Sequence, residues 1–191
     1  MRRIVIRKGF HYPFPFLPTA LPFWVSKKKN TIKEFKFKFT DSCMFNLHDE
    51  DQHDINKLFG FSIGHHQKRS SFRFGWRPIL DENRIELVGY EYHDGVRQPS
   101  IPITRVKIDK WYRCLLTYVP TRQETYYSVS TVAGTSVSDM SFQEGKNSFN
   151  LKKKGGLGYT LGIYFGGNER APQKITILKE KSTWKLPTIP I

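Results

Sequence analysis

The sequence predicts an all-β protein: one antiparallel sandwich with an extended arm at the N-terminal end and an extended strap at the C-terminal end. Short runs of alternating apolar and polar residues recur along the chain, as in Thr31–Phe39, where three phenylalanines alternate with lysines. Turn-forming sequences such as His93-Asp94-Gly95 separate these runs. No window of helical length has a convincing period of about 3.6 residues. Many short strands with regular turns are typical of a sandwich or jelly roll.

The composition supports a single ordered domain with acidic partners. The chain has 191 residues, of which 38% are hydrophobic and 15% aromatic, so it can fill a real core. Its formal charge of +14 favours nucleic acid, an acidic glycan, an anionic membrane or an acidic protein surface as partner, and it is also compatible with a plain solvated surface. Cys43 and Cys114 provide neither a disulfide framework nor a cysteine-rich metal motif.

The chain divides into three parts: residues 1–30 as a basic arm, residues 31–181 as the sandwich, and residues 182–191 as an extended tail. The arm alternates aromatics with prolines, so it should be extended and should bury its rings on another surface. That surface is either its own domain or a partner. The residues expected to interact are Arg2, Arg3, Arg7, Lys8, Phe14, Phe16, Phe23, Trp24, Lys27, Lys28 and Lys29.

The apolar part of the arm superficially resembles a signal peptide or a membrane span. Pro13, Pro15, Pro18 and Pro22 break any helix there, and a span needs about 20 apolar helical residues. We therefore expect no signal peptide and no membrane partner.

The strands expected after Phe39 follow at short intervals, each bounded by turn residues. They are Leu58–Ile63, Ser71–Arg77, Ile85–Tyr92, Thr104–Ile108, Trp111–Val119, Tyr126–Val132, Tyr159–Phe165 and Lys174–Leu178. The next-to-last is apolar on both faces, which predicts a central strand, and the last alternates, which predicts one dry face. Residues 134–158 are polar and glycine-containing, which predicts a long loop with one weak strand near Ser148–Leu151.

The end of the domain carries a resemblance to a known fold. Tyr164-Phe165-Gly166-Gly167-Asn168, followed by Ala171-Pro172 and an alternating strand, resembles the closing hairpin of concanavalin A-like jelly rolls. That family includes lectins, glycanases, polysaccharide lyases and non-enzymatic virion and surface modules. The resemblance implies a fold and leaves the chemistry open.

Sites for metals and for hydrolysis are not supported. The acidic stretch NLHDEDQHDINKLFG contains His48 and His53, but its spacing fits no zinc or calcium template, so we predict an exposed turn, no metal and no cofactor. No Gly-x-Ser-x-Gly motif is present. Glu86 and Glu91 are spaced to lie on opposite faces of a strand, which does not suit a glycosidase pair.

A polysaccharide lyase acting on an acidic glycan is a weaker alternative. Arg84-Ile85-Glu86-Leu87 resembles the Arg-x-Glu-Leu strand of alginate lyases, and the Tyr-Phe-Gly-Gly-Asn sequence from Tyr164 resembles their Tyr-Phe-Lys-Ala-Gly strand. Arg170 stands where those enzymes place their catalytic Tyr, and their Gln-Ile/Val-His strand has no counterpart. Without that base and acid, we predict no catalytic activity.

Glycan binding without catalysis is the other alternative. Aromatic rings on strands can stack on sugars, although rings at alternating positions are more often part of a core. The candidate glycan contacts are Trp76, Arg84, Tyr90, Tyr92 and Tyr164.

Residues 54–97 resemble uncharacterised sandwich proteins of Bacteroidetes and of their tailed phages, including crAss-like phages. This resemblance and the two strap-like ends favour a non-enzymatic virion component of the tail, neck or capsid. Such a protein would bind other subunits through its arm and sandwich surface, with an acidic protein or nucleic acid as possible contacts of the basic arm. It would be found in the virion, or in the host cytoplasm during assembly.

Overall fold

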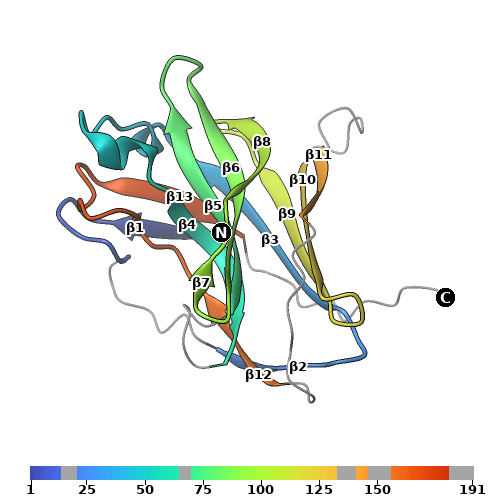
Figure 1. Ribbon diagram of the computed structural model, residues 1–191. Helices are drawn as coiled ribbons and strands as arrows, with labels where there is room; N and C mark the ends of the chain where they lie inside the picture. The colour runs from blue at the N-terminus through green and yellow to red at the C-terminus, as the bar shows by residue number, and fades with distance from the viewer. Residues whose placement is uncertain (14–20, 65–69, 133–140, 146–155, 181–191) are drawn as a thin grey trace.

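The computed structural model describes residues 1–13, 21–64, 70–132, 141–145 and 156–180. They form an antiparallel β-sandwich (Figure 1), as predicted, with thirteen strands and two short 3-10 helices among the described residues. The helices are η1 (Asp41–Cys43) and η2 (Glu50–His53). No helix in the described part of the chain is long and apolar enough to cross a membrane.

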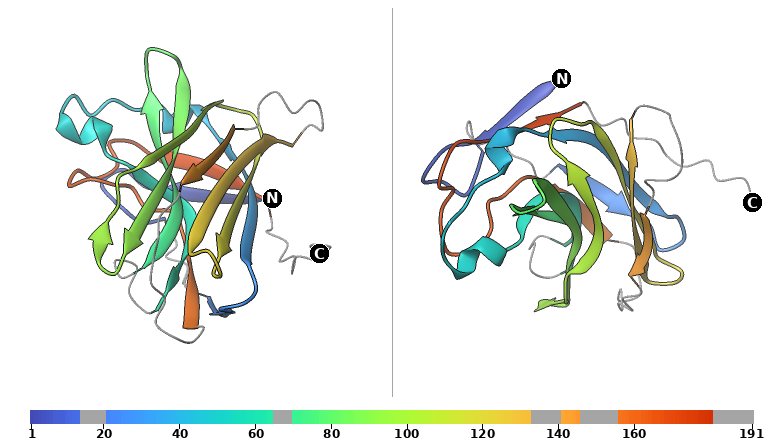
Figure 2. Two further views of the ribbon diagram at one scale, coloured as in Figure 1. Left: turned by 45° about the vertical axis from the view of Figure 1, so that its right-hand side comes forward. Right: turned by 90° about the horizontal axis from the view of Figure 1, so that it is seen from above.

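The strands form two sheets that face each other (Figure 2). Sheet A has the order β1 (Arg2–Ile6), β13 (Ile175–Lys179), β3 (Thr31–Phe39), β9 (Tyr112–Val119), β10 (Glu124–Thr131) and β11 (Ser141–Gly145). Sheet B has the order β2 (Pro22–Val25), β12 (Gly156–Leu161), β4 (Asn56–Ile63), β5 (Ser71–Ile79), β6 (Arg84–His93) and β7 (Val96–Arg97), and β8 (Ile101–Lys107) also pairs with β6.

An aromatic core lies between the sheets. Successive side chains of a strand point to opposite faces, so alternate phenylalanines of β3 and β5 meet in the middle. Phe39 of β3 packs on Trp76 of β5 with ring centroids 5.1 Å apart, and Phe72 of β5 stacks on Tyr118 of β9 at 5.3 Å. Cys43 and Cys114 are buried as free thiols.

The N-terminal segment differs from the prediction. Residues 1–30 were expected as an arm separate from the sandwich of residues 31–181, packed on that domain or on a partner, but they contain an edge strand of each sheet: β1 pairs with β13 over five residue pairs, and β2 pairs with β12. Ile6 and Val25 are buried in the core. The prolines did not prevent these pairings, because Pro22 begins β2 at a sheet edge, where proline is tolerated, and β1 contains no proline.

Some predictions for this segment and the tail cannot be compared with the structure. Phe14, Phe16, the weak strand near Ser148–Leu151 and the tail 182–191 lie outside the described residues. Trp24 is exposed on β2, and Lys28 and Lys29 are exposed between β2 and β3.

One expected strand ends before it reaches Tyr164, a residue of the cavity described below. Tyr159–Phe165 was predicted as a single strand, but β12 ends at Leu161. Tyr164 then forms an isolated bridge with Lys57 of β4, exchanging two backbone hydrogen bonds of 2.8 and 3.0 Å. The break separates Tyr164 from the regular ladder and sets its side chain beside β4 on the outer face of sheet B.

Candidate functional site

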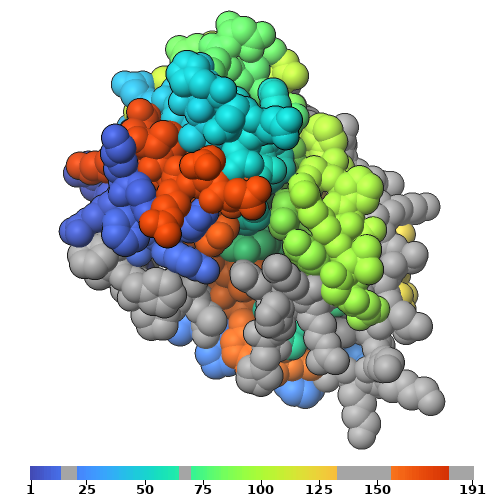
Figure 3. Space-filling model, turned by 60° about the vertical axis from the view of Figure 1, so that its left-hand side comes forward, coloured from blue at the N-terminus to red at the C-terminus, as the bar shows by residue number. Residues whose placement is uncertain are grey.

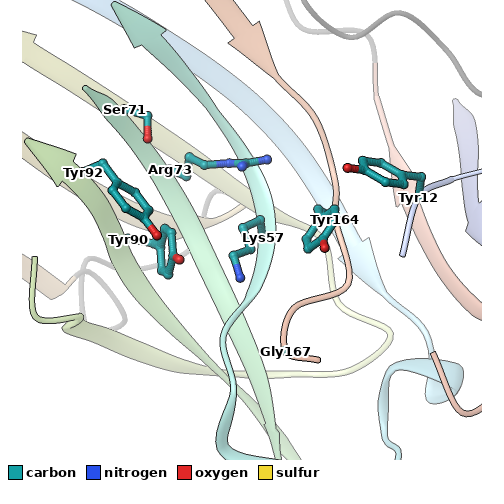
Figure 4. Close-up of a pocket in the computed structure, with 8 residues that line it drawn as sticks. All are labelled: Tyr12, Lys57, Ser71, Arg73, Tyr90, Tyr92, Tyr164 and Gly167. Atoms are coloured by element: carbon teal, nitrogen blue, oxygen red, sulfur yellow. The ribbon is translucent and has the colours of Figure 1, made fainter. Parts of the chain in front are cut away.

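A cavity of about 240 Å³ lies on the outer face of sheet B. It is lined by Tyr12, Lys57, Ser71, Arg73, Tyr90, Tyr92, Tyr164 and Gly167 (Figure 4). Figure 3 shows this face of the molecule hollowed between the red-orange residues of the C-terminal hairpin and the light-green residues around the end of β6. The lining therefore combines residues far apart in the sequence.

Strand register brings four of the lining residues together. Ser71 and Arg73 of β5 lie opposite Tyr92 and Tyr90 of β6, respectively. Because side chains alternate along a strand, all four point to the same face, away from the core. The neighbouring strand β4 contributes small residues there, Gly60 opposite Arg73 and Ser62 opposite Ser71, which leave room above the sheet.

Arg73 is a buried cation at the floor of the cavity. Its side chain is only 6% exposed, and Nη2 donates a hydrogen bond of 2.5 Å to the carbonyl O of Gly162. Burial lowers the pKa of Arg73 to about 10, and nearby tyrosines oppose that shift. Arg73 is therefore still positively charged near neutral pH, in a setting where little water screens its charge.

Lys57 lies in the middle of the cavity (Figure 4), at the start of an irregularity in the β4–β5 pairing. Burial lowers the pKa of its amine to about 8; the charge of Arg73 adds to that shift and the charge of Asp54 opposes it. The nitrogen lies 4.8 Å from the ring centroid of Tyr90 and 5.6 Å from that of Tyr164. A sizeable fraction of this amine is neutral slightly above neutral pH, and a neutral amine can accept a proton.

The pKa values of two tyrosines beside Lys57 are raised, whereas the pKa of Lys57 is lowered. The pKa of Tyr90 is raised to about 12 by burial and by a hydrogen bond with Tyr92, and burial also raises the pKa of Tyr164. Arg97 lies over the Tyr90 ring at 5.0 Å. These two phenols keep their protons near neutral pH, so they can donate hydrogen bonds or protons. Titratable neighbours whose pKa values are pushed apart are typical of acid–base pairs.

A loop at one end of the cavity is fixed by side chains around η2. Asp51 Oδ2 accepts hydrogen bonds from the backbone N–H groups of Asn168 (2.9 Å) and Glu169 (2.5 Å). Asn56 Oδ1 accepts one from Gly166 N–H (2.8 Å). Gly167 has a φ of 78°, which glycine adopts readily, and it lines the cavity. The acidic stretch predicted as a turn thus anchors the loop after Tyr164.

The structure separates the predicted glycan contacts into two groups. Tyr90, Tyr92 and Tyr164 come together in the cavity, where their contact with a glycan stays a prediction. Trp76 is wrong as a contact, because it is fully buried against Phe39. Arg84 begins β6 opposite Ile79 and does not line the cavity.

The two carboxylates considered for hydrolysis lie on opposite faces of β6, as their spacing indicated. Glu86 points outward and pairs with Arg77 at 2.6 Å. Glu91 points into the core, where it accepts a hydrogen bond of 2.8 Å from Tyr127. Among the described residues, no three metal-ligating side chains gather closely enough to hold an ion.

Sequence reasoning missed four of the polar lining residues: Tyr12, Lys57, Ser71 and Arg73. A signal for two of them was present, because Ser71 and Arg73 alternate with the apolar Phe72 and Phe74, which marks them as outward-facing. The irregular pairing near Lys57 and the return of Tyr12 to the site depend on tertiary structure.

The fold and its cavity together define a concanavalin A-like sandwich with a basic, tyrosine-lined site on one face. An alginate lyase from a Chlorella virus matches this structure with a TM-score of 0.55 and 11% identity, over 94% of this chain and 82% of that one. A GH131 β-glucanase catalytic domain from Podospora anserina gives a TM-score of 0.41 at 10% identity, covering 96% and 73%. Chicken galectin 2 gives 0.33 at 12%, covering 83% and 98%. No protein-family model and no curated protein matches the sequence.

The lyase match corrects two predictions. We expected a virion component without catalytic activity, but the chain shares its fold with a lyase over nearly its whole length, and several titratable side chains line one cavity. The sequence lacks a Tyr and a His at the positions where alginate lyases carry them, but Lys57 of β4 and Tyr90 of β6 line the cavity. None of the three matches is a Bacteroidetes or phage protein, so that resemblance stays a prediction.

Proposed function

We propose that the cavity binds an acidic polysaccharide built of uronic acids and cleaves it by β-elimination. The observation that carries this proposal is the combination of Arg73 and Lys57 between the phenols of Tyr90 and Tyr164 in one cavity. The fold of an alginate lyase supports it, since alginate is a polymer of uronic acids. The net charge of +14 also favours an acidic polymer.

The first requirement of this reaction is neutralisation of the uronate carboxylate. Loss of the proton next to that group leaves negative charge spread into the carboxylate, and a fixed cation stabilises it. The Arg73 guanidinium suits this role because its planar fork matches a carboxylate and its burial strengthens the interaction. Arg97, which lies over the Tyr90 ring, adds positive charge at the end of the cavity that Tyr90 lines.

The second requirement is a base and an acid. The Lys57 amine takes the proton from C5, the electron pair forms the C4–C5 double bond, and the C4–O4 bond breaks. The Tyr90 phenol gives its proton to the departing O4, and solvent then returns the two groups to their starting states. At mildly alkaline pH the lowered pKa of Lys57 leaves much of this amine neutral, and the raised pKa of Tyr90 keeps its phenol protonated.

The proposal is tested by incubating the purified protein with a panel of uronate polymers and following the ultraviolet absorbance of the unsaturated product. We expect activity on at least one polymer, and a loss of at least about a hundredfold in Lys57→Met and Arg73→Gln. Arg77→Gln is the matched control, because Arg77 also points outward from β5 but is bound to Glu86.

The same experiment separates the second candidate, a lectin-like module. Binding of a uronate polymer without any unsaturated product would show that the cavity recognises glycans and does not cleave them. Activity retained in both Lys57→Met and Arg73→Gln would show that the reaction takes place elsewhere.

A further inference from the structure

The N-terminal segment Gly9–Pro13 is fastened to the wall of the cavity. Gly9 N–H donates to the carbonyl O of Ala171 (2.9 Å), and Ala171 N–H donates to that of Phe10 (3.2 Å). Phe165 N–H donates to the carbonyl O of His11 (2.8 Å), and His11 Nδ1–H donates to that of Phe165 (2.9 Å). The segment is therefore hydrogen-bonded along the hairpin that carries Tyr164, and it lies beside the cavity.

Two rings of this N-terminal segment pack against the Tyr164 ring. The His11 ring is stacked on the Tyr164 ring, with centroids 5.2 Å apart and an interplanar angle of 7°. Tyr12 meets the same ring edge-on at 4.9 Å and 72°. Tyr12 nevertheless remains 50% exposed and lines the cavity. A half-exposed ring on a backbone held this firmly is preorganised for stacking on a ligand.

The position of Tyr12 extends the site in one direction. From Tyr90 on β6, the path crosses Arg73 on β5, Lys57 on β4 and Tyr164 before it reaches Tyr12, in the order that Figure 4 shows. The Tyr90 and Tyr164 rings lie 4.8 and 5.6 Å from the Lys57 nitrogen, and the Tyr12 ring lies 4.9 Å from the Tyr164 ring. Because these steps follow one another from Tyr90 to Tyr12 (Figure 4), the path is longer than a single sugar ring.

We propose that Tyr12 is a sugar-binding residue at the outer end of this site, and that the site takes several linked uronate units with the bond to be cleaved in the interior. This inference rests on the proposed function. Units on one side of Lys57 contact Tyr90 and Tyr92, and units on the other side contact Tyr164 and Tyr12. Recognition then increases with the length of the oligosaccharide, and Tyr12 contributes only when the chain is long enough to reach it.

The inference is tested with defined uronate oligosaccharides, a pentasaccharide and the shortest one that is cleaved. In Tyr12→Ala we expect kcat/KM to fall roughly tenfold on the pentasaccharide, mainly through KM, with little change on the shortest substrate. Tyr12→Phe keeps the ring and should resemble the parent protein. Trp24→Ala removes another exposed aromatic, outside the cavity, and is the matched control.

Equal losses on both substrates would overturn the inference, because Tyr12 would then act by supporting Tyr164. No loss on either substrate would overturn it too. If the parent protein cleaves no uronate, the inference is tested by comparing the affinities of the parent protein and of the same variants for the pentasaccharide. Weaker binding by Tyr12→Ala would support the inference although elimination had failed, and unchanged or undetectable binding would overturn it.

Discussion

Gly60 of β4 lies directly opposite Arg73 of β5, so close that no larger residue fits between the strands. A Cβ atom at Gly60 would lie 2.6 Å from Arg73 Cα and 2.0 Å from the carbonyl O of Phe72. These are backbone atoms, which cannot turn aside as the end of a flexible side chain can. The glycine therefore sets the approach of β4 to β5 at the point where Arg73 enters the floor of the cavity.

Gly60→Ala should consequently weaken both the fold and the site. The two strands must separate locally, and we expect a loss of about 1–3 kcal/mol in the free energy of unfolding, with reduced activity because Arg73 moves. Gly156→Ala is the control, since its nearest neighbour, Ile63 Cγ2, would lie 3.6 Å away, an ordinary contact. Urea unfolding checks the prediction, and equal stability of the two variants would contradict it.

The pH dependence of cleavage should follow Lys57. A base must be deprotonated, so kcat/KM should rise as the pH increases through about 8, the lowered pKa of this amine. The Tyr90 pKa of about 12 keeps the acid protonated over the same range. A pH–rate profile on the best polymer provides the measurement. A profile that is flat or falling between pH 7 and 9 would exclude Lys57 as the base.

Stability should also increase with pH, because lysines are buried. Burial lowers the pKa of Lys33, which points into the core over the Phe23 ring, from 10.5 to about 7. Between these values the unfolded chain holds more protons than the folded one, so the free energy of unfolding rises with pH across this window. Lys57 and Lys179, with pKa values lowered to about 8, act in the same direction.

Replacing Lys33 shows how much of the rise in stability with pH comes from this residue. Lys33→Met should be more stable than the parent protein at neutral pH and should show a smaller rise in stability towards pH 10. Lys36→Met on the same strand, where Lys36 pairs with Glu180 at 3.3 Å, is the control. Chemical unfolding at several pH values provides the comparison, and an unchanged pH dependence in Lys33→Met would refute the assignment.

The N-terminal segment should be required for folding. Removal of residues 1–30 deletes both edge strands and the buried side chains of Ile6 and Val25, so we expect loss of the cooperative thermal transition. Ile6→Ala alone should cost about 2–5 kcal/mol, whereas Arg3→Ala on the same strand should cost little because Arg3 is exposed. A cooperative melt of the truncated protein would restore the view of this segment as a separate arm.

Much of the fold could be predicted from local patterns. The alternation in Thr31–Phe39 and the turns between short strands depend only on neighbouring residues, and the structure has strands at those places. The pairing of residues 1–30 with the sheets has no local signal, because their prolines indicate an extended arm, whereas β1 needs β13, at the other end of the chain, as its partner. Pairings of this kind are decided by tertiary contacts.

The site could be predicted only in part. Tyr90, Tyr92 and Tyr164 could be predicted as glycan contacts because they are aromatic residues on strands. Whether each ring faces the core or the surface depends on the parity of its position, that is, on which alternating positions of the strand face the core. Trp76 shares its parity with Phe72 and Phe74, which assigns it to the core. The association of Lys57 with Tyr164 depends on an isolated bridge that no local pattern reveals.

The central claim, cleavage by elimination in this cavity, is tested most directly by mass spectrometry of the products from a defined uronate oligosaccharide. Elimination adds no water, so the masses of the two fragments should sum to the mass of the substrate, and Lys57→Met should yield no fragments. Fragments whose masses sum to the substrate plus one water would identify a hydrolase and contradict the claim. An intact substrate that is bound would contradict it as well, in favour of a lectin.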